Sequence, residues 1–519
     1  MREPKALTSG RLAVIVVSVS ALPLLALANV ANLNRLNPDA VAYLMIARYW
    51  HDGVLALAVS SYWSPLFSWM VAALMLPLPD VIAAGRAAMA VSGMVFLLGG
   101  IAVLRAMVVP DQALGVGAVA LLGFAIAWSV RIMTPDLLVS GLLMMAVAAV
   151  LHPSWLTVKR RQIAAGIVFG VAYYAKTIGL PLGLAFIVAT GVWYAQTGGG
   201  ARAAMTAAAR TGMVMLLVAA PWIGVLSAKS GTPTFGTSGA INFAIAGPSY
   251  HGTHPAFTTF YAPREGRVTA WEDPSEMHYA SWAPWRSAAA AAYFLRLVRA
   301  NLEATLATLR GFDLFGLGLA GLLIAPLVAG TGPPRAWRVA VLPVALVAAI
   351  YLPVNSDGEP RYLMPTYPFL LAAAGAVLFA IAGTQGRGLA LRRIAATLLL
   401  TVSFLMPLRY DIAVALTGRA NPYFLMAQQV AEAARAAAVP GGVASVGEMG
   451  FVAIFTAFLL NRPFVGTEDT LPDLDRLRRL GTGVLIVGRD RPEDVALAGD
   501  AHVTKLPTHA ATVVAYRLQ

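Results

Sequence analysis

The sequence predicts an α-helical protein that crosses a membrane about eleven times and ends in a small α/β domain. Hydrophobic residues make up 58% of the 519 residues and charged residues only 12%, whereas a soluble protein of this size carries roughly a quarter charged residues. Apolar runs long enough to cross about 30 Å of hydrocarbon recur along most of the chain. Charged residues return after about residue 422, where short β-type runs alternate with helical runs.

The basic charge of the chain is best explained by a membrane. The formal net charge is +13 and the isoelectric point is about 10.1. Many Lys and Arg residues flank apolar spans, so we expect them to bind anionic membrane lipids and to orient the helices, and we expect no nucleic-acid partner. The chain has no cysteine, which excludes disulfide bonds and thiol redox chemistry.

The predicted spans follow one another along the first four-fifths of the chain. Segment 12–30 has the basic start of a signal peptide, but its apolar run is long enough to span, so we predict a helix. Segment 65–77 is bounded by prolines and is predicted to be a re-entrant or interfacial helix. The spans are 12–30, 81–104, 112–130, 135–151, 162–175, 179–195, 208–227, 313–330, 336–353, 363–383 and 394–408.

The distribution of Lys and Arg in the short loops predicts a cytoplasmic N-terminus, with residue 159 inside and residue 250 and the C-terminus outside. The outer side then receives 31–80, 131–136, 176–178, 228–312, 354–362 and all residues after about 409. We predict two domains from this topology. They are a transmembrane domain at 1–410, with outer loops 31–80 and 228–312, and a small extracytoplasmic α/β domain at 422–519.

Segment 287–310, in the second outer loop, has apolar residues at helical spacing between charged positions. It is predicted to lie as an amphipathic helix in the outer interface of the membrane, with an ordinary helix packed on protein as the alternative. Gly447 and Gly450 in the C-terminal domain are too sparse for a dinucleotide-binding fingerprint. The elements predicted for that domain are strands at 443–446, 462–465, 484–487 and 512–516 and helices at 448–460, 473–480 and 492–498.

Asp39 stands just past the end of the first apolar span. A carboxylate beside hydrocarbon is costly unless it does chemistry or lines a wet cavity. Two interpretations of Asp39 are open. One is a cap of the helix-like stretch 41–50, and the other is a general base, which needs a carboxylate near a reacting hydroxyl. Asp52 follows one short helix later and is typical of a solvated turn.

Arg131, Asp136 and Lys176 also fall at the predicted outer ends of spans. Thr134-Pro135-Asp136 has the pattern of a helix start, and Asp136 is also a candidate for a polar pocket, with Arg131 nearby. Lys176 follows two tyrosines, and it either extends its amine to the membrane interface or binds a phosphate as a point charge.

The segment Asn355-Ser356-Asp357-Gly358-Glu359-Pro360-Arg361-Tyr362 packs two acids and one cation into a short loop, and part of it is a turn. Glu359 is a pocket candidate, and the planar guanidinium of Arg361 fits a phosphate or a carboxylate. No metal site is predicted. Three histidines lie among aromatic residues in loop 228–312, but their spacing matches no metal template: His251, His254 and His278.

In their order, spacing and common outward side, five runs resemble motifs of the GT-C superfamily of membrane glycosyltransferases. The family-39 type is most similar, which includes protein O-mannosyltransferases, lipid A aminoarabinose transferases and rhizobial galacturonosyl transferases. The resemblance covers about residues 10–410. The runs are Pro38-Asp39-Ala40-Val41-Ala42-Tyr43, Tyr62-Trp63-Ser64-Pro65-Leu66-Phe67, Thr134-Pro135-Asp136-Leu137-Leu138, Ala175-Lys176-Thr177-Ile178-Gly179-Leu180-Pro181 and Arg361-Tyr362-Leu363-Met364-Pro365-Thr366-Tyr367-Pro368.

The resemblance implies an enzyme of a bacterial-type plasma (inner) membrane. It would move a hexose or pentose, with inversion, from a polyprenyl-phosphate donor to a hydroxyl of a glycan, lipid or protein acceptor on the outer face. Asp39 matches the position of the general base and Lys176 a basic position that faces the donor, and Arg361 is expected to hold the phosphate with it. Tyr43 and Tyr362 are pocket candidates. No cofactor is implied, and a divalent cation is left open.

Two positions depart from the family pattern. Some relatives have an acid directly after the first Asp, where this chain has Ala40, and aminoarabinose-type relatives have a Lys where this chain has Ser64. The second departure argues against aminoarabinose as the sugar. A transporter or lipid flippase is the alternative function, although transporters commonly show two related halves, and none is found here. A third interpretation is a non-catalytic scaffold whose small domain binds a partner.

Overall fold

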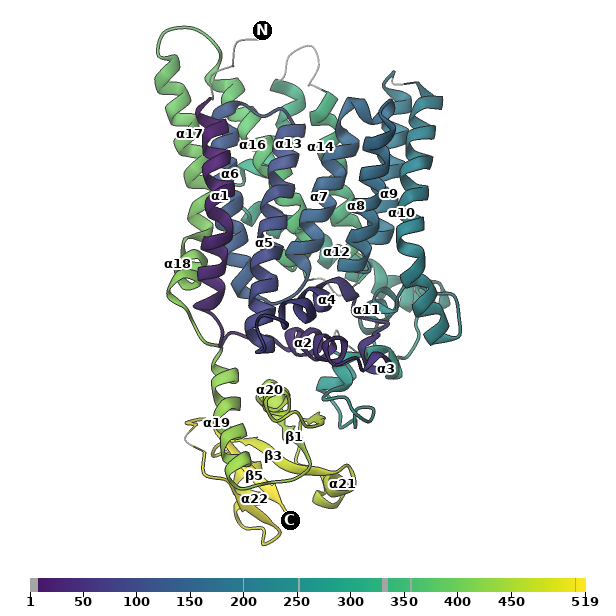
Figure 1. The fold of residues 1–519 in the computed structure, drawn as a ribbon, viewed down its shortest axis with the longest axis vertical. Coiled ribbons are helices and arrows are strands. Elements are labelled where there is room, and N and C mark those ends of the chain that lie inside the picture. Colours follow the sequence, from purple (N-terminus) through teal and green to yellow (C-terminus); the bar gives the residue numbers. More distant parts are fainter. Residues whose placement is uncertain (1–7, 199, 251–252, 329–334, 355–356, 509) are drawn as a thin grey trace.

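The computed structural model describes residues 8–198, 200–250, 253–328, 335–354, 357–508 and 510–519. It shows a bundle of roughly parallel helices with the C-terminal domain beyond one end (Figure 1). We call this end the domain-facing end of the bundle. Helix α1 (Ser9–Val30) begins at the opposite end.

The chain is an integral membrane protein. Among the described residues, seven helical segments are long and apolar enough to cross a membrane: Ser9–Val30, Val81–Ala106 (α5), Asp111–Arg131 (α6), Gly179–Gln196 (α9), Ala201–Ser230 (α10), Pro360–Ala382 and Leu389–Ala436. The last two contain α16 (Tyr367–Ala382) and α17 (Leu389–Leu405). Four shorter helices lie beside them in the bundle: α7 (Asp136–Leu151), α8 (Lys159–Ala175), α13 (Leu317–Val328) and α14 (Arg335–Tyr351). Every predicted span overlaps one of these helices, although residues 329–330 of span 313–330 lie outside the described residues.

Glycines allow the central helices of the bundle to approach closely. A Cβ atom added to Gly99 of α5 would collide with the backbone of Gly141 on α7, and one added to Gly141 would meet the backbone of Val95. Helices in a membrane associate mainly through such tight packing, because lipid chains are as apolar as the side chains they contact. Buried residues therefore dominate α5, α6 and α7.

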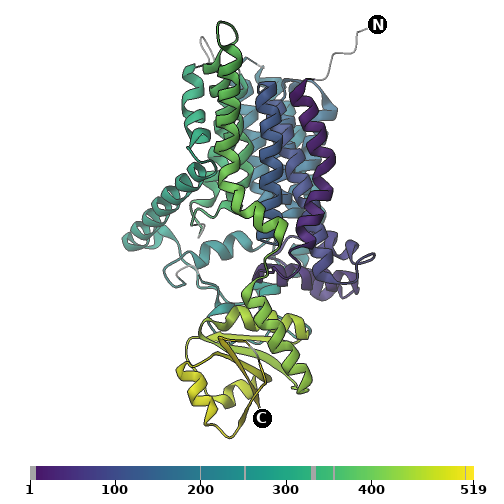
Figure 2. The same cartoon turned by 90° about the vertical axis from the view of Figure 1, so that its left-hand side faces the viewer.

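Short helices cover the domain-facing end. They are α2 (Pro38–His51), α3 (Leu55–Ala58), α4 (Pro65–Leu74) and α11 (Ser238–Ile245). Helix α4 corresponds to the predicted interfacial segment 65–77, and ten residues rise only about 15 Å, too little to cross a membrane. Helix α12 (Ala288–Gly311) corresponds to the predicted amphipathic segment and runs obliquely to the parallel helices (Figure 2).

The C-terminal domain begins with α19 (Pro422–Ala436) and contains a five-stranded sheet in the order β2-β1-β3-β5-β4. The strands are β1 (Gly442–Val446), β2 (Phe464–Glu468), β3 (Thr482–Gly488), β4 (Val503–Lys505) and β5 (Val513–Leu518). Neighbouring residues of a strand face opposite sides, so one side packs with α19 and α20 (Gly450–Leu460). The other side packs with α21 (Leu474–Arg479) and α22 (Pro492–Ala498). This domain matches the predicted small α/β unit, with β4 as an additional strand.

The C-terminal domain is packed against the bundle. Its core is continuous with that of the bundle on the side of α19 and α20. The guanidinium of Arg48 on α2 lies 4.8 Å from the ring centre of Phe458 on α20. Elements of the bundle and of the C-terminal domain therefore meet at the domain-facing end.

Candidate active site

A cavity of about 780 Å³ lies at the domain-facing end, between the short helices, loop 228–312, loop 354–362 and the C-terminal domain. We call it the polar cavity. Four carboxylates and two cations are among its lining residues: Asp39, Asp136, Asp357, Glu359, Lys176 and Arg361. Ionisable groups beside a membrane are expensive and mark functional sites. This concentration of charge makes the polar cavity the candidate active site.

Asp39 lies in the first turn of α2 but does not cap this helix. The N-cap residue of α2 is Asn37, and no side-chain cap hydrogen bond is formed there. The Asp39 carboxylate instead accepts a hydrogen bond from Arg361 Nη1 at 2.8 Å on Oδ2 and one from Trp271 Nε1 at 3.3 Å on Oδ1. Its side chain is 20% exposed. A carboxylate held at both oxygens and open to the cavity is oriented for contact with a ligand.

Arg361 lies on the short helix α15 (Pro360–Leu363), where the chain enters the bundle again. It donates through Nη1 to Asp39 and through Nη2 to the Tyr362 hydroxyl at 3.2 Å. Its buried Nε has no hydrogen-bond partner among the described residues. Because a guanidinium carries five N–H donors, Arg361 keeps donors for an anion in the cavity.

Lys176 and Asp136 form a second ion pair in the polar cavity. The Lys176 amine donates to Asp136 Oδ1 at 2.5 Å, and Thr134 Oγ1 donates to Asp136 Oδ2 at 2.6 Å. Asp136 also begins α7, so both interpretations of this residue hold. The Asp136 side chain is 4% exposed and that of Lys176 is 25% exposed. Lys176 is therefore the member of this pair that a ligand in the cavity can reach.

The ring of Tyr362 links the two cations. The Lys176 amine lies 4.7 Å and the Arg361 guanidinium 5.0 Å from the centre of this ring. Tyr362 is stacked on Tyr351 with a centroid distance of 4.8 Å and an interplanar angle of 11°. Cation–π contacts of this kind hold a positive charge without neutralising it. Lys176 and Arg361 are therefore held in one part of the cavity.

A second wall of the polar cavity is aromatic and uncharged. The Trp271 ring centre lies 5.3 Å from Trp63 and 4.4 Å from His254, and Trp63 lies 4.8 Å from the buried Tyr43. Burial lowers the pKa of His254 to about 4, so this imidazole is neutral at neutral pH. Trp63 Nε1 donates to the backbone oxygen of Trp271 at 2.7 Å. This wall offers ring faces and neutral hydrogen-bonding groups.

Seven of the predicted site residues line the polar cavity, and one does not. Arg131 is half exposed, pairs with Asp411 of α18 (Arg409–Thr417) at 3.4 Å and lies over the ring of Trp128. Its prediction as a pocket residue is wrong, because its side chain contacts Asp411 and Trp128 and does not line the polar cavity. The seven that line the cavity are Asp39, Tyr43, Asp136, Lys176, Glu359, Arg361 and Tyr362.

The other residues singled out in the outer loops differ in their placement. His254 lines the cavity, whereas His278 is exposed, and His251 and residues 355–356 lie outside the described residues. Within the described part of the chain, no group of three or more His, Cys, Asp or Glu side chains is arranged to hold a metal ion.

Trp271 and Phe451 both line the polar cavity, and neither was predicted from the sequence. Trp271 contacts Asp39 although the two residues are 232 positions apart in the sequence. Phe451 belongs to the C-terminal domain. The density of tryptophan and tyrosine in loop 228–312 is the available signal for Trp271, because exposed loops seldom carry so many large aromatic residues. Nothing in the sequence around Phe451 sets it apart from its apolar helix.

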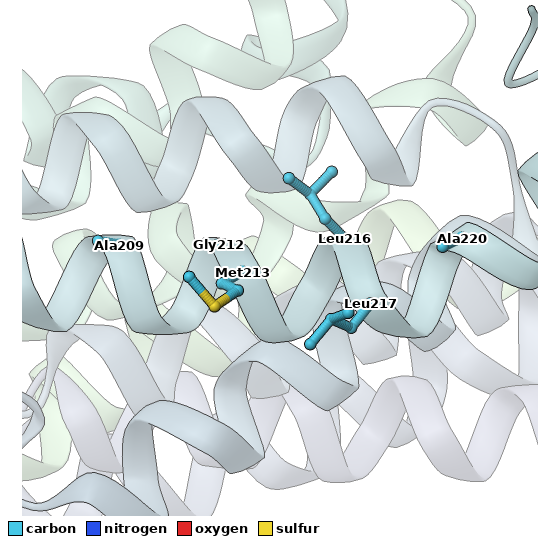
Figure 3. A pocket seen from close by; sticks show the side chains of 6 residues that line it. All are labelled: Ala209, Gly212, Met213, Leu216, Leu217 and Ala220. Atoms are coloured by element: carbon cyan, nitrogen blue, oxygen red, sulfur yellow. The ribbon is translucent and has the colours of Figure 1, made fainter.

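A second hollow of about 530 Å³ lies on one face of α10 (Figure 3). Its lining residues are all apolar: Ala209, Gly212, Met213, Leu216, Leu217 and Ala220. It offers no side chain for acid–base chemistry or phosphate binding. The polar cavity is therefore the site that we relate to function.

Known structures share the fold of this chain at low sequence identity. ArnT from Cupriavidus metallidurans bound to undecaprenyl phosphate has a TM-score of 0.58 and 18% identity, over 96% of this chain and 97% of ArnT. The archaeal oligosaccharyltransferase AglB from Archaeoglobus fulgidus, in complex with an inhibitory peptide and a dolichol-phosphate, has a TM-score of 0.55 and 11% identity, over 91% of this chain and 69% of AglB. The arabinofuranosyltransferase AftD from Mycobacteria has a TM-score of 0.52 and 15% identity, over 98% of this chain and 40% of AftD.

These likenesses show that the chain has the GT-C fold, as the sequence motifs predicted. No protein-family model matches the chain, and no curated protein matches it in sequence.

Proposed function

We propose that this GT-C-fold protein is a membrane glycosyltransferase. It moves a hexose or pentose from a polyprenyl-phosphate donor to an acceptor hydroxyl of a glycan, lipid or protein. The observation that carries the proposal is the Asp39–Arg361 pair at 2.8 Å, beside Lys176, in a cavity of about 780 Å³. A base, two cations and a neutral aromatic wall are the groups that this transfer needs in one place.

The reaction follows from these groups. The acceptor oxygen attacks the anomeric carbon, the bond from this carbon to the phosphate oxygen breaks, and Asp39 takes the proton of the acceptor hydroxyl. The bonding electrons leave with polyprenyl phosphate, whose growing negative charge Lys176 and Arg361 stabilise. Attack from the face opposite the phosphate inverts the anomeric centre.

The donor phosphate would exchange with existing partners in the cavity. Arg361 has an unpartnered Nε among the described residues, and Lys176 is the exposed member of its ion pair. The polyprenyl-phosphate class is supported by ArnT, with undecaprenyl phosphate, and AglB, with a dolichol-phosphate. The sugar would lie against the aromatic wall, where His254 and Asn242 provide neutral polar groups.

Purified protein with a panel of radiolabelled undecaprenyl-phosphate-linked hexoses and pentoses tests this function. We expect one donor to give free undecaprenyl phosphate and a labelled acceptor when a membrane glycolipid and glycan fraction is added. A transporter or flippase would move a fluorescent donor across liposomes and leave the sugar–phosphate bond intact. Intact donors throughout the panel would contradict the glycosyltransferase.

We also propose that the protein lies in a bacterial-type plasma (inner) membrane, with the polar cavity and the C-terminal domain outside. The absence of native cysteine makes labelling informative. Glu265→Cys is expected to react with an impermeant maleimide in intact cells, and Lys159→Cys only after permeabilisation, because positive loops stay inside. Both positions are exposed in the structure. Labelling of residue 159 from outside would contradict this topology.

A further inference from the structure

We propose that the C-terminal domain positions Asp39, by holding the two ends of segment 260–269 of loop 228–312 against its edge strand β2. This inference rests on the proposed function, because Asp39 is its base. Strand β2 is at the edge of the sheet. A free sheet edge offers unpaired N–H and C=O groups to another extended segment.

This segment contacts β2 at both of its ends. Tyr261 N donates to Val465 O at 2.6 Å, and Phe464 N donates to Val268 O at 2.6 Å. An antiparallel bridge pairs Phe260 with Gly466 and a parallel bridge pairs Thr269 with Phe464, so the segment turns between two isolated contacts with β2. Main-chain hydrogen bonds of this kind fix the position of a segment along a strand.

Side chains of the C-terminal domain hold the start of the segment as well. The guanidinium of Arg476 lies 5.5 Å from the ring centre of Phe260. Arg476 Nη2 also pairs at 2.9 Å with Glu468 Oε1, which accepts a hydrogen bond from Phe260 N at 3.3 Å. The segment is thus attached to the domain by its backbone and by a ring contact.

The end of the segment becomes the turn that carries Trp271. Thr269 Oγ1 accepts a hydrogen bond from Trp271 N at 3.2 Å, and Glu272 Oε1 accepts one from Thr269 N at 2.9 Å. Together they form a capping box around the short helix Ala270–Glu272. Thr269 and Glu272 are fully buried, so the position of Thr269 determines that of Trp271.

Trp271 completes the path to Asp39, because its Nε1 donates to Asp39 Oδ1 at 3.3 Å. A second contact runs in parallel. The ring of Phe451 lies 6.3 Å from Phe257, which lies 5.2 Å from Trp271. Among the described residues that line the polar cavity, only Phe451 belongs to the C-terminal domain. The domain therefore acts on Asp39 through Trp271, a positioning residue.

Gly466→Ala separates segment 260–269 from β2. Gly466 has a φ of +117°, and a Cβ atom there would collide with Thr259 O and lie 3.0 Å from Phe260 Cα. The matched control is Gly481→Ala in the same domain, since Gly481 has a φ of +74° and open space around its Cβ position. Both variants carry backbone strain, but only the first displaces the loop.

For Gly466→Ala we expect kcat of sugar transfer from the accepted donor to fall about 10- to 100-fold, because small displacements of a reacting group have such effects. The donor KM should stay within about threefold, since the cations are not on this path. Amide hydrogen exchange of the peptide 260–272 should become faster in Gly466→Ala and stay as in the wild type in Gly481→Ala.

Trp271→Phe is the second test variant, because it keeps an aromatic ring but removes the N–H group that donates to Asp39. We expect a similar loss of kcat, and little further loss when it is combined with Gly466→Ala, because both changes act through one contact. With an active wild-type protein, this inference would be overturned if Gly466→Ala left kcat or the amide hydrogen exchange of peptide 260–272 unchanged. It would also be overturned if the losses of kcat in the two single variants added fully in the double variant. A wild-type protein that transfers no sugar would overturn the proposed function instead, and unchanged exchange would still count against the contact between segment 260–269 and β2.

Discussion

Replacement of Asp39 by Asn is expected to lower turnover by about 10² or more, while donor affinity changes little. Asn has nearly the shape of Asp but cannot take the proton of the acceptor hydroxyl. Arg361 Nη1 and Trp271 Nε1 donate to different oxygens of Asp39, and Asn replaces one of these oxygens by an NH2 group, so one of the two hydrogen bonds is lost in this geometry. Steady-state kinetics of sugar transfer and separate binding of undecaprenyl phosphate measure the two effects.

Asp52→Asn is the matched control for this experiment. Asp52 stands at the C-cap of the same helix, with a side chain that is 58% exposed. Its replacement should leave turnover close to that of the wild type, since exposed surface changes have small effects. Near-normal turnover in Asp39→Asn would end the general-base assignment and leave Asp136 or Glu359 as the next carboxylate to test.

Replacement of Lys176 by Ala is expected to weaken donor binding about 10- to 100-fold, since a hydrogen bond to a charged group contributes about 1.5–3 kcal/mol. Turnover should fall as well, because the positive charge faces the phosphate in the ground state and in the transition state. The variant also leaves the buried Asp136 carboxylate without its cation. Loss of one member of a buried pair should lower the free energy of unfolding by roughly 2–4 kcal/mol.

A double variant separates donor binding from stability. Lys176→Met combined with Asp136→Asn removes both charges and nearly keeps the side-chain volumes. The Tm of this double variant should therefore be close to that of the wild type, whereas Lys176→Ala alone lowers it. Binding of undecaprenyl phosphate, measured by titration in detergent, should remain weak. If the double variant regained full donor affinity together with its Tm, Lys176 would be a structural partner of Asp136 and no phosphate ligand.

Hydropathy and charge distribution were sufficient to predict the helical bundle. The spans are set by apolar length, which is local information, and the helical bundle agrees with that prediction. The GT-C fold was implied by the resemblance of the five motifs and not by hydropathy. Topology also places Asp39, Lys176 and Arg361 at one end of the bundle, where they meet in the polar cavity. Topology does not say which side chains of that end face one another, and Arg131 shows the difference, because it pairs with Asp411.

Contacts between distant parts of the chain could not be predicted. The capping box around Trp271 is a local pattern, Thr269 followed three residues later by Glu272. The contacts of this turn with Trp63 and Asp39 join distant parts of the chain, and the local sequence does not predict them. Strand β2 begins two residues later than predicted, at the point where Phe464 pairs with Val268 and Thr269. Strand β4 has only three residues, two of them exposed, so it carries no alternation to recognise.

The order in which the site residues occur along the chain has a consequence for biosynthesis. Asp39 is made 322 residues before its partner Arg361, which at 5–20 residues per second corresponds to roughly 15–60 s of translation. Strand β2, which pairs with the loop that carries Trp271, is made later still. A nascent chain therefore holds the carboxylate at the membrane for much of its synthesis, before the arginine, the tryptophan turn and the contact with β2 assemble around it.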